Sequence, residues 1–265
     1  RRVSIDTTGA ADPAPVLPAL SRKPMIGASF RFDGIVPTGD ASNGMATLDE
    51  HAEAVKQVAV ADRILITKSD LVDTGRASAL QERLKALNPA APIYPVANGV
   101  IDPEVLLHAG LFQPGEKIPD VANWLRDEAY SDDHHGHHHH HHDVNRHDAR
   151  VSSFSLTFDE PLNWDGIVTW IEMLIATRGD SLLRIKGILN LAGEDLPVVL
   201  HGVQHVFHPP VRLDAWPTDD PRSRLVFITR DLGRDAIEQT FRAFHQAAAD
   251  AQNSISGLLI LLSHT

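Results

Sequence analysis

The chain has 265 residues, 43% of them hydrophobic, which is enough for one large domain or two ordinary ones with real cores. Its 24 basic and 35 acidic residues give a formal net charge of −11, and an acidic surface argues against nucleic acid as a partner. There is no cysteine, which excludes disulfides and thiolate metal sites for this chain. No apolar run approaches the roughly 20 residues that span a bilayer, and no signal peptide opens the chain, so we expect a cytoplasmic protein without a membrane partner.

The first 130 residues alternate short apolar runs with helical patterns, which is typical of a parallel sheet with crossover helices. Residues 63–67 predict a short buried strand. Residues 93–96 predict another strand, in which Pro95 favours an edge position or a strand end. The helix expected between them has one apolar face, formed by Leu80, Leu84 and Leu87.

Residues 151–265 have a different rhythm, which predicts a small α+β domain with an antiparallel sheet backed by helices. Strands are expected at 153–158, 182–191, 197–207 and 225–229. A helical stripe is expected at Trp164, Ile167, Val168, Ile171, Leu174 and Ile175. A last amphipathic helix carries Ile237, Phe241 and Phe244.

Residues 131–150, between these two zones, form a low-complexity linker that cannot build a core. Eight of nine consecutive residues there are histidines, namely His134, His135, His137, His138, His139, His140, His141 and His142. Neutral imidazole is a good ligand for Zn²⁺, Ni²⁺, Co²⁺ and Cu²⁺, so the segment predicts many overlapping metal sites of modest selectivity. A purification tag and a solvated spacer that binds metal by accident are the alternatives.

The segment Thr67–Asp70 reads Thr-Lys-Ser-Asp and directly follows the predicted strand at 63–67. One carboxylate can accept from the two N–H donors on one edge of guanine, a pair that adenine lacks, and the stem of Lys68 can lie against the ring. The segment therefore predicts guanine recognition. A helix cap after a strand explains the same four residues without a ligand.

An acid-bearing turn, Asp6–Pro13, follows Val3 and Ile5, which predict the end of a strand. P-loop nucleoside triphosphatases hold Mg²⁺ through an acid at a strand end, usually by way of water. Gly9 would let the backbone approach a γ-phosphate. A Gly/Pro turn with acid caps is the alternative. To share one nucleotide, this turn and Thr67–Asp70 must lie side by side at the carboxyl edge of a single parallel sheet.

Together these segments resemble the CobW family of P-loop GTPases over nearly the whole chain. Residues 6–16 resemble the family's Glu-Thr-Thr-Gly-Leu-Ala-Asp-Pro segment, and Thr67–Asp70 falls where the family places its guanine motif. The histidine-rich linker matches the family's histidine-rich insertion. Further similar segments are 40–44, 48–51, 57, 61–63, 143–147, 183–187, 216–217 and 224–228.

The resemblance implies an α/β P-loop GTPase domain, with a parallel sheet and flanking helices, followed by a small α+β CobW C-terminal domain. The expected boundaries are 1–130 for the GTPase domain, 131–150 for the histidine-rich linker and 151–265 for the C-terminal domain.

The function that the resemblance implies is that of a GTP-hydrolysing metallochaperone, which delivers a divalent metal to a client metalloprotein. Zinc is the expected metal, with Co²⁺ and Ni²⁺ as alternatives, and GTP and Mg²⁺ are the expected cofactors. The site residues carried over are Thr67, Lys68 and Asp70 for guanine, Asp6 for Mg²⁺, and Thr8 and Gly9 for the γ-phosphate. The C-terminal domain would contact the client or a second copy in a homo-oligomer. There are two alternatives. One is a non-catalytic metal buffer, and the other is an activator of a cobalt or iron enzyme, such as a nitrile hydratase or an enzyme of the cobalamin pathway.

Some features depart from the family or stay unassigned. Asp6 stands where the family usually has glutamate. We assign no role to Asp40. His201 and His205 share parity on the predicted strand and could face one side, with His208 on the other, and a satisfied core or surface histidine explains each of them best. Trp164, Trp170 and Trp216 are expected in the core or at an interface.

The family's phosphate-binding loop, Gly-x-x-x-x-Gly-Lys-Ser/Thr, is absent from these 265 residues, as is the Cys-x-Cys-Cys motif that follows it. The chain starts inside a predicted strand without methionine, so we expect a truncation. Without that loop there is no backbone cradle and no lysine for the phosphates, so this chain alone should bind GTP poorly and hydrolyse it negligibly. A calorimetric titration that gave micromolar affinity for GTP would contradict this expectation.

Overall fold

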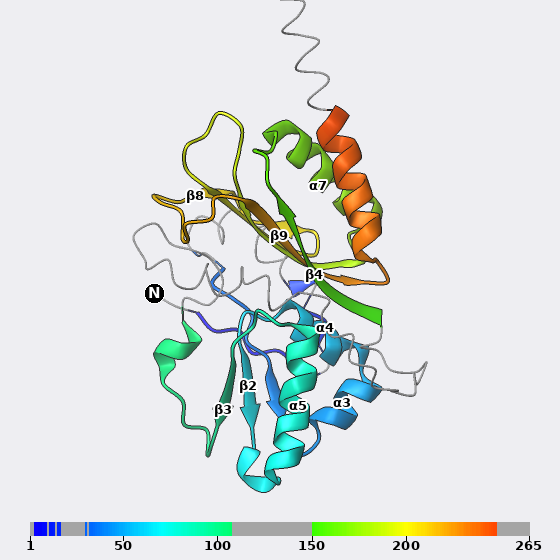
Figure 1. Ribbon diagram of the computed structural model, residues 1–265. Helices are drawn as coiled ribbons and strands as arrows, with labels where there is room; N and C mark the ends of the chain where they lie inside the picture. The colour runs from blue at the N-terminus through cyan, green and yellow to red at the C-terminus, as the bar shows by residue number, and fades with distance from the viewer. Residues whose placement is uncertain are drawn as a thin grey trace, which may run out of the picture. The chain divides into compact units, whose positions relative to one another are not determined.

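The computed structural model divides the chain into two compact units, Arg1–Ser153 and Phe154–Thr265 (Figure 1). The structure describes residues 3–9, 11–13, 15–16, 30, 32–107 and 150–247. The boundaries expected from the sequence, 1–130, 131–150 and 151–265, stay a prediction, because residues 108–149 lie outside the described ranges.

A three-stranded parallel sheet with the order β1-β2-β3 forms the centre of the first unit. Its strands are β1 (Thr38–Asp40), β2 (Ile64–Thr67) and β3 (Ile93–Val96). The two strands predicted here are confirmed, and Pro95 lies in an edge strand as expected, where a missing N–H costs no ladder hydrogen bond. β1 was not predicted, because Thr-Gly-Asp has no apolar alternation.

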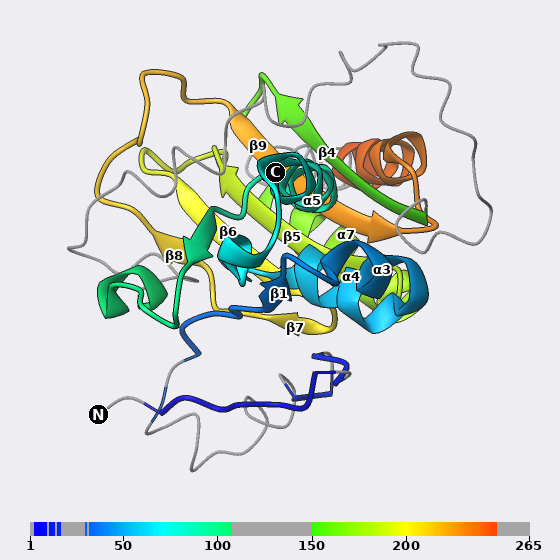
Figure 2. The same ribbon diagram turned by 90° about the horizontal axis from the view of Figure 1, so that it is seen from below.

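Three helices lie on one side of this sheet (Figures 1 and 2). They are α3 (Gly44–Glu50), α4 (Ala52–Val60) and α5 (Thr74–Leu87). Parallel strands laid down in sequence order are joined by right-handed crossovers, which put successive helices on the same face. Ile64 and Ile66 of β2 pack there against the predicted apolar face of α5, Leu80, Leu84 and Leu87, all of them buried.

Residues 3–9 are exposed and form no strand, so the strand end expected at Val3 and Ile5 is not found. These two side chains are 65% and 54% exposed. A strand inside a parallel sheet needs a hydrogen-bonding neighbour, and none of the described strands pairs with this segment.

The second unit holds a six-stranded sheet with the order β4-β9-β5-β6-β7, with β8 also paired to β6. The strands are β4 (Val151–Phe158), β5 (Leu182–Leu189), β6 (Val198–Val203), β7 (Val206–Phe207), β8 (Val211–Arg212) and β9 (Ser223–Arg230). β5 pairs antiparallel with both β6 and β9. Helix α7 (Trp164–Arg178) and a helix at 234–247 cover one face, so the expected α+β architecture is confirmed.

Trp170, on α7, belongs to the core of this unit and is fully buried. Its ring meets Phe227 and Phe241 edge-on, with centroids 5.9 and 4.9 Å away, and its Nε1–H donates to Thr240 Oγ1 at 3.0 Å. The indole therefore buries its apolar area without losing a hydrogen bond. Trp164, which the predicted stripe also included, begins α7 and is 38% exposed.

The predicted strand at 197–207 is in fact a hairpin, β6 and β7, joined by Gln204 and His205. Gln204 has a φ of 52°, in the left-handed region that tight hairpin turns need. A glutamine there gives no turn signal in the sequence, which is why the break was missed.

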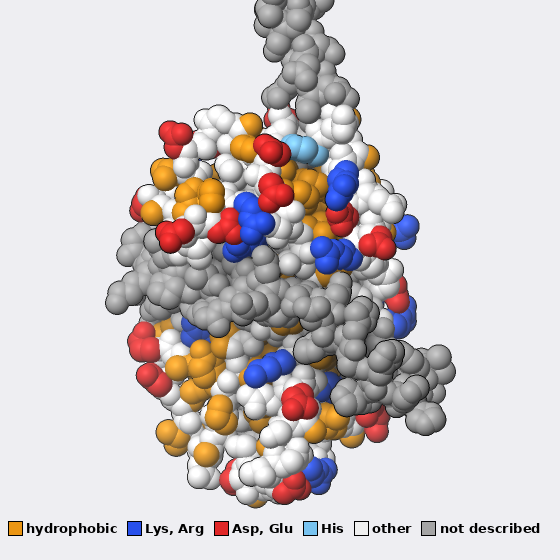
Figure 3. Space-filling view, viewed as in Figure 1, with side chains coloured by type: hydrophobic (Ala, Val, Ile, Leu, Met, Phe, Trp, Pro, Cys, Tyr) orange, Lys and Arg blue, Asp and Glu red, His pale blue; other side chains and the backbone are white. Residues whose placement is uncertain are grey.

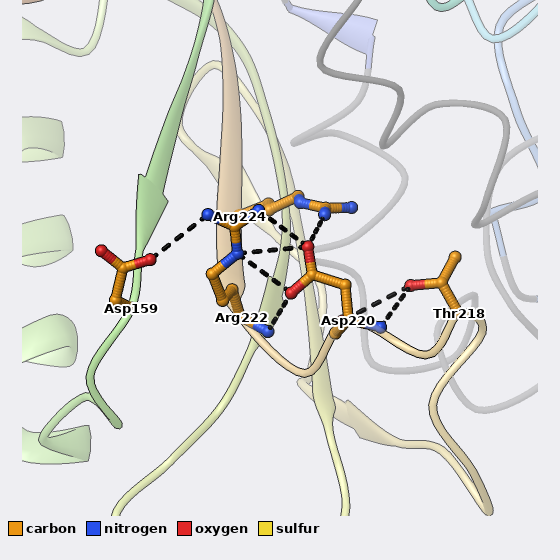
Figure 4. A network of polar contacts seen from close by, with 5 residues as sticks. All are labelled: Asp159, Thr218, Asp220, Arg222 and Arg224. Atoms are coloured by element: carbon orange, nitrogen blue, oxygen red, sulfur yellow. Dashed lines mark hydrogen bonds and ion pairs between the residues drawn. The ribbon is translucent and has the colours of Figure 1, made fainter.

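A polar network fixes the loop that leads into β9 (Figure 4). Asp220 accepts from the Nε and Nη2 of Arg222 at 3.0 and 2.9 Å and also pairs with Arg224. Arg222 reaches across to Asp159 at 3.2 Å. The hydrogen bonds from Arg222 are the main reason why the pKa of Asp220 is lowered to about 2.

Charges of both signs are interspersed on the face in Figure 3, and the side chains described on that face gather into no basic stripe. None of the helices that the structure describes is long and apolar enough to cross a bilayer.

Asn88, just after α5, ties the end of that helix to the end of α4. Its buried Nδ2 donates to the carbonyls of Val58, Ala59 and Ala61 at 2.9, 3.2 and 2.9 Å, in the last turn of α4 and just beyond it, where few backbone donors are at hand. Asn88→Ala should destabilise the first unit by about 1–3 kcal/mol, because buried carbonyls lose their donor. Native-state hydrogen exchange of the β2 amides measures this loss. Lys85→Ala, on the exposed side of α5, is the control, and equal protection in both variants would contradict the assignment.

Candidate functional site

The three strands of the first unit end at one edge of the sheet. Asp40 pairs in register with Thr67, and Thr67 with Val96, so the last residues of β1, β2 and β3 form a row. The ends of β1 and β2 are joined further, because Ala41 N donates to Thr67 O at 2.9 Å and Thr67 Oγ1 donates to Gly39 O at 3.1 Å. The segment that follows Thr67 therefore starts from a fixed position.

Asp40 is the residue at this edge that sequence reasoning left unassigned. Its Oδ2 pairs with Lys68 Nζ at 2.6 Å, and its Oδ1 accepts from Ser42 N at 2.7 Å. The hydrogen bond from Lys68 is the largest cause that lowers the pKa of Asp40 to about 2, so this carboxylate is ionised at every physiological pH. A carboxylate that accepts a hydrogen bond from the backbone N–H two residues later forms an Asx turn. The sequence Asp-Ala-Ser-Asn is typical of such a turn and could have indicated that Asp40 is held in place.

Asp70 lies in a short 3₁₀ turn, Ser69–Leu71, directly beyond β2. Lys68 precedes this turn in the left-handed conformation, with φ 56° and ψ 28°, which is uncommon outside glycine and asparagine. Asp70 is exposed, and in the part of the chain that the structure describes its carboxylate has no hydrogen-bond or ion-pair partner. The edge thus holds one lysine that is anchored and one carboxylate that is free to accept.

The other predicted site residues, Asp6, Thr8 and Gly9, lie in the exposed segment 3–9. Helix α4 holds the end of this segment. Gln57 Nε2 donates to the carbonyls of Gly9 and Ala11 at 3.1 and 2.7 Å, and Lys56 Nζ pairs with Asp12 at 2.8 Å. Between residues 3–9 and Thr67–Asp70 the structure gives no hydrogen bond or ion pair, so their predicted side-by-side placement stays a prediction.

A tight turn follows β3 at the same edge. Val100 N donates to Ala97 O at 3.0 Å, and the two central residues, Asn98 and Gly99, have φ of 53° and 72°. This pair suits the turn, since asparagine and glycine adopt positive φ at the least cost. All four residues of the turn are exposed.

The histidines of the second unit do not lie as expected. His201 is buried in β6, and its ring stacks on that of His208 with centroids 5.1 Å apart, so the expectation that the two face opposite sides is wrong. The hairpin turn after β6 brings them together. Both ring nitrogens of His201 lack a partner within the described ranges, and burial holds its pKa well below the ordinary value of 6.5.

No group of three or more histidine and acidic side chains that could hold a metal is present within the described ranges. The predicted metal ligands, His134, His135 and His137–His142, lie outside those ranges, so they stay a prediction.

Two family models match the chain. Residues 1–95 match the CobW/HypB/UreG nucleotide-binding domain, and residues 151–245 match the cobalamin synthesis protein CobW C-terminal domain. The zinc chaperone YjiA of Escherichia coli is 30% identical over 240 residues, which cover 91% of this chain and 70% of that protein. The chain belongs to the CobW family. It is therefore a relative of P-loop GTPases, as the resemblance implied.

Two further comparisons agree with the CobW assignment. The zinc-regulated GTPase metalloprotein activator 1 of Saccharomyces cerevisiae is 22% identical over 284 residues, which cover 91% of this chain but only 61% of that protein. The crystal structure of Zn(II)-bound YjiA GTPase from E. coli superposes with a TM-score of 0.67 at 26% identity, over 89% of this chain and 68% of that one. The expected CobW-type fold, a nucleotide-binding domain followed by a CobW C-terminal domain, is confirmed.

Proposed function

We propose that this CobW-family chain acts as part of a GTP-binding and GTP-hydrolysing metallochaperone that delivers zinc to a client metalloprotein. The observation that supports guanine binding is the free carboxylate of Asp70 at the carboxyl edge of the β1-β2-β3 sheet, next to the anchored Lys68. In open sheets of this kind, ligands bind outside the carboxyl ends of the strands. The names of the E. coli and yeast relatives support zinc as cargo.

Asp70 fits a guanine base by its hydrogen-bonding capacity. An ionised carboxylate only accepts, and its two oxygens can meet the two N–H donors on one edge of guanine. Lys68 contributes a stem of apolar methylene groups that can cover one face of the ring while its ammonium stays at Asp40. Thr67 links this turn to β1 through its hydroxyl, so the two binding residues are carried by a fixed strand end.

Fewer of these 265 residues can bind the phosphates of GTP, because the sequence does not include the family's phosphate-binding loop. Bound Mg²⁺ would neutralise phosphate charge, and Asp6 is the acid proposed to support it. Thr8 and Gly9 are proposed to sense the γ-phosphate. Their segment is hydrogen-bonded to α4, because Gln57 donates to the Gly9 carbonyl. A movement of this segment would therefore break or shift a contact with that helix. Hydrolysis in such proteins rests on positioning and electrostatics more than on covalent steps by the protein.

The metal side of the proposal rests on the histidine run at 134–142, which offers overlapping sites for Zn²⁺, Co²⁺ or Ni²⁺. The second unit is proposed to contact the client or a second copy of the protein. The same histidine run also favours a second candidate function, a non-catalytic metal buffer. A third candidate function, the activation of a cobalt or iron enzyme, would use the same nucleotide site and the same histidine run with a different metal ion.

Asp70→Asn should change base selectivity in the full-length protein. The amide presents one acceptor and one donor, so it loses a hydrogen bond to guanine and matches xanthine, which has a carbonyl where guanine has its amino group. We expect GTP affinity to fall about tenfold or more and xanthosine triphosphate affinity to rise, as leaving a charged-group hydrogen bond unmade costs about 1.5–3 kcal/mol.

Nucleotide titrations with both triphosphates measure this change. Asp73→Asn is the matched control, because it removes the same charge three residues away while asparagine still caps α5. Unchanged GTP affinity in Asp70→Asn would overturn the guanine assignment.

Zinc transfer separates the metallochaperone from the buffer. In the full-length protein loaded with Zn²⁺, GTP hydrolysis should speed transfer to an apo metalloprotein client, and the rate of hydrolysis should respond to metal or client. Transfer is followed with a zinc-dependent client activity, with a non-hydrolysable GTP analogue as the control. A hydrolysis rate that ignores both metal and client, together with several ions bound by the histidine run, would favour the buffer.

A further inference from the structure

The carboxyl edge of the first sheet contains a lysine whose position is set by a neighbouring strand. Lys68 follows β2, and its ammonium reaches back to Asp40 at the end of β1, 28 residues earlier in the chain. The Lys68 side chain is 55% exposed, whereas that of Asp40 is 23% exposed. Within the described residues, this ion pair is the polar contact of the Lys68 side chain.

Asp40 is a fixed anchor and not itself a mobile side chain. Its Oδ1 accepts from Ser42 N at 2.7 Å, and its Oδ2 accepts from Asn43 Nδ2 at 3.3 Å in addition to Lys68. The backbone on both sides is held, since Asp40 is in register with Thr67 and Ala41 N donates to Thr67 O. The carboxylate therefore has one position relative to the turn that carries Asp70.

The backbone of Lys68 adds a second constraint. Its φ of 56° places it in the left-handed region, which lysine adopts only when its surroundings favour it. The 3₁₀ turn closes behind it through Leu71 N, which donates to Lys68 O at 3.1 Å. Anchoring of the ammonium and the left-handed backbone together reduce the freedom of this long side chain.

We propose that Asp40 is a positioning residue for nucleotide binding, which holds the stem of Lys68 in place as one wall of the guanine pocket before the nucleotide arrives. The inference rests on the proposed GTP-binding function and deepens it. Asp40 touches no part of the base. It acts through Lys68 by removing in advance the entropy that a free lysine would lose on binding.

A plain surface ion pair is the alternative explanation. Exposed lysine–carboxylate pairs contribute little to stability, so such a pair would leave nucleotide affinity unchanged when it is removed. A positioning role predicts a change in affinity without a change in base selectivity, since Asp70 still reads the edge of the base.

The test is a double-mutant cycle in the full-length protein, with Asp40→Asn, Lys68→Met and the double variant. Asparagine keeps the acceptor for Ser42 N, so the turn after β1 should persist. GTP affinity should fall about three- to tenfold in Asp40→Asn, the range expected when one long side chain must be ordered on binding. Lys68→Met should weaken binding as well, and adding Asp40→Asn to it should have no further effect, because the two residues act as one unit.

Selectivity and a control complete the experiment. The ratio of GTP to inosine triphosphate affinity should be unchanged in Asp40→Asn, because inosine lacks only the amino group that Asp70 reads. Asp73→Asn serves again as the matched charge control and should bind GTP as the unaltered protein does. Circular dichroism melting of each variant shows whether the fold is retained.

Three results would overturn the inference. Equal GTP affinity in Asp40→Asn and the unaltered protein would leave the guanine proposal standing but remove the role of Asp40. The role of Asp40 would also be removed if Asp40→Asn lowered GTP affinity as much in the Lys68→Met variant as in the unaltered protein. The same holds if Asp40→Asn unfolds the protein while Lys68→Met folds and binds GTP normally. Absence of GTP binding by the unaltered full-length protein would overturn both the proposed function and this inference.

Discussion

The parallel register of β1, β2 and β3 is the constraint on which the candidate site depends. It aligns Asp40, Thr67 and Val96 in one row, so the segments that leave these strands start at the same edge. The register is held by burial, since Ile64 and Ile66 must face α5, and a slip of one residue would turn them to the other side. The polar chemistry at the edge is thus specified by apolar packing elsewhere in the sheet.

The contact between Asp40 and Lys68 has more consequence for geometry than for stability. Both side chains keep solvent exposure, and exposed pairs gain little net free energy after screening and ordering. What the pair does is to tie the turn after β2 to the strand beside it. An interaction that adds little to the free energy of folding can still fix the position of a side chain such as that of Lys68.

The parts of the fold that follow local patterns were predictable from the sequence. Leu80, Leu84 and Leu87 gave the buried face of α5, and Pro95 marked an edge strand, because each signal lies within a few residues. The ion pair of Asp40 was not predictable in this way, since it depends on which strands become neighbours. The hairpin was missed because Gln204 gives no turn signal, and the stacking of His201 on His208 was missed because it depends on that hairpin.

The two sheets also differ in where the ends of neighbouring strands lie. Neighbouring strands of an antiparallel sheet, such as β5 and β6, end at opposite edges, so their last residues do not meet in a row as Asp40 and Thr67 do. The second unit instead places polar side chains across its strands, as in the row formed by Lys186 and His201, which are register partners. His201 is buried and stays neutral, because burial holds its pKa low, and it adds no charge there. The row of strand ends at one edge is thus a feature of the first unit's sheet, and it carries Asp40, Thr67 and, one residue further on, Lys68.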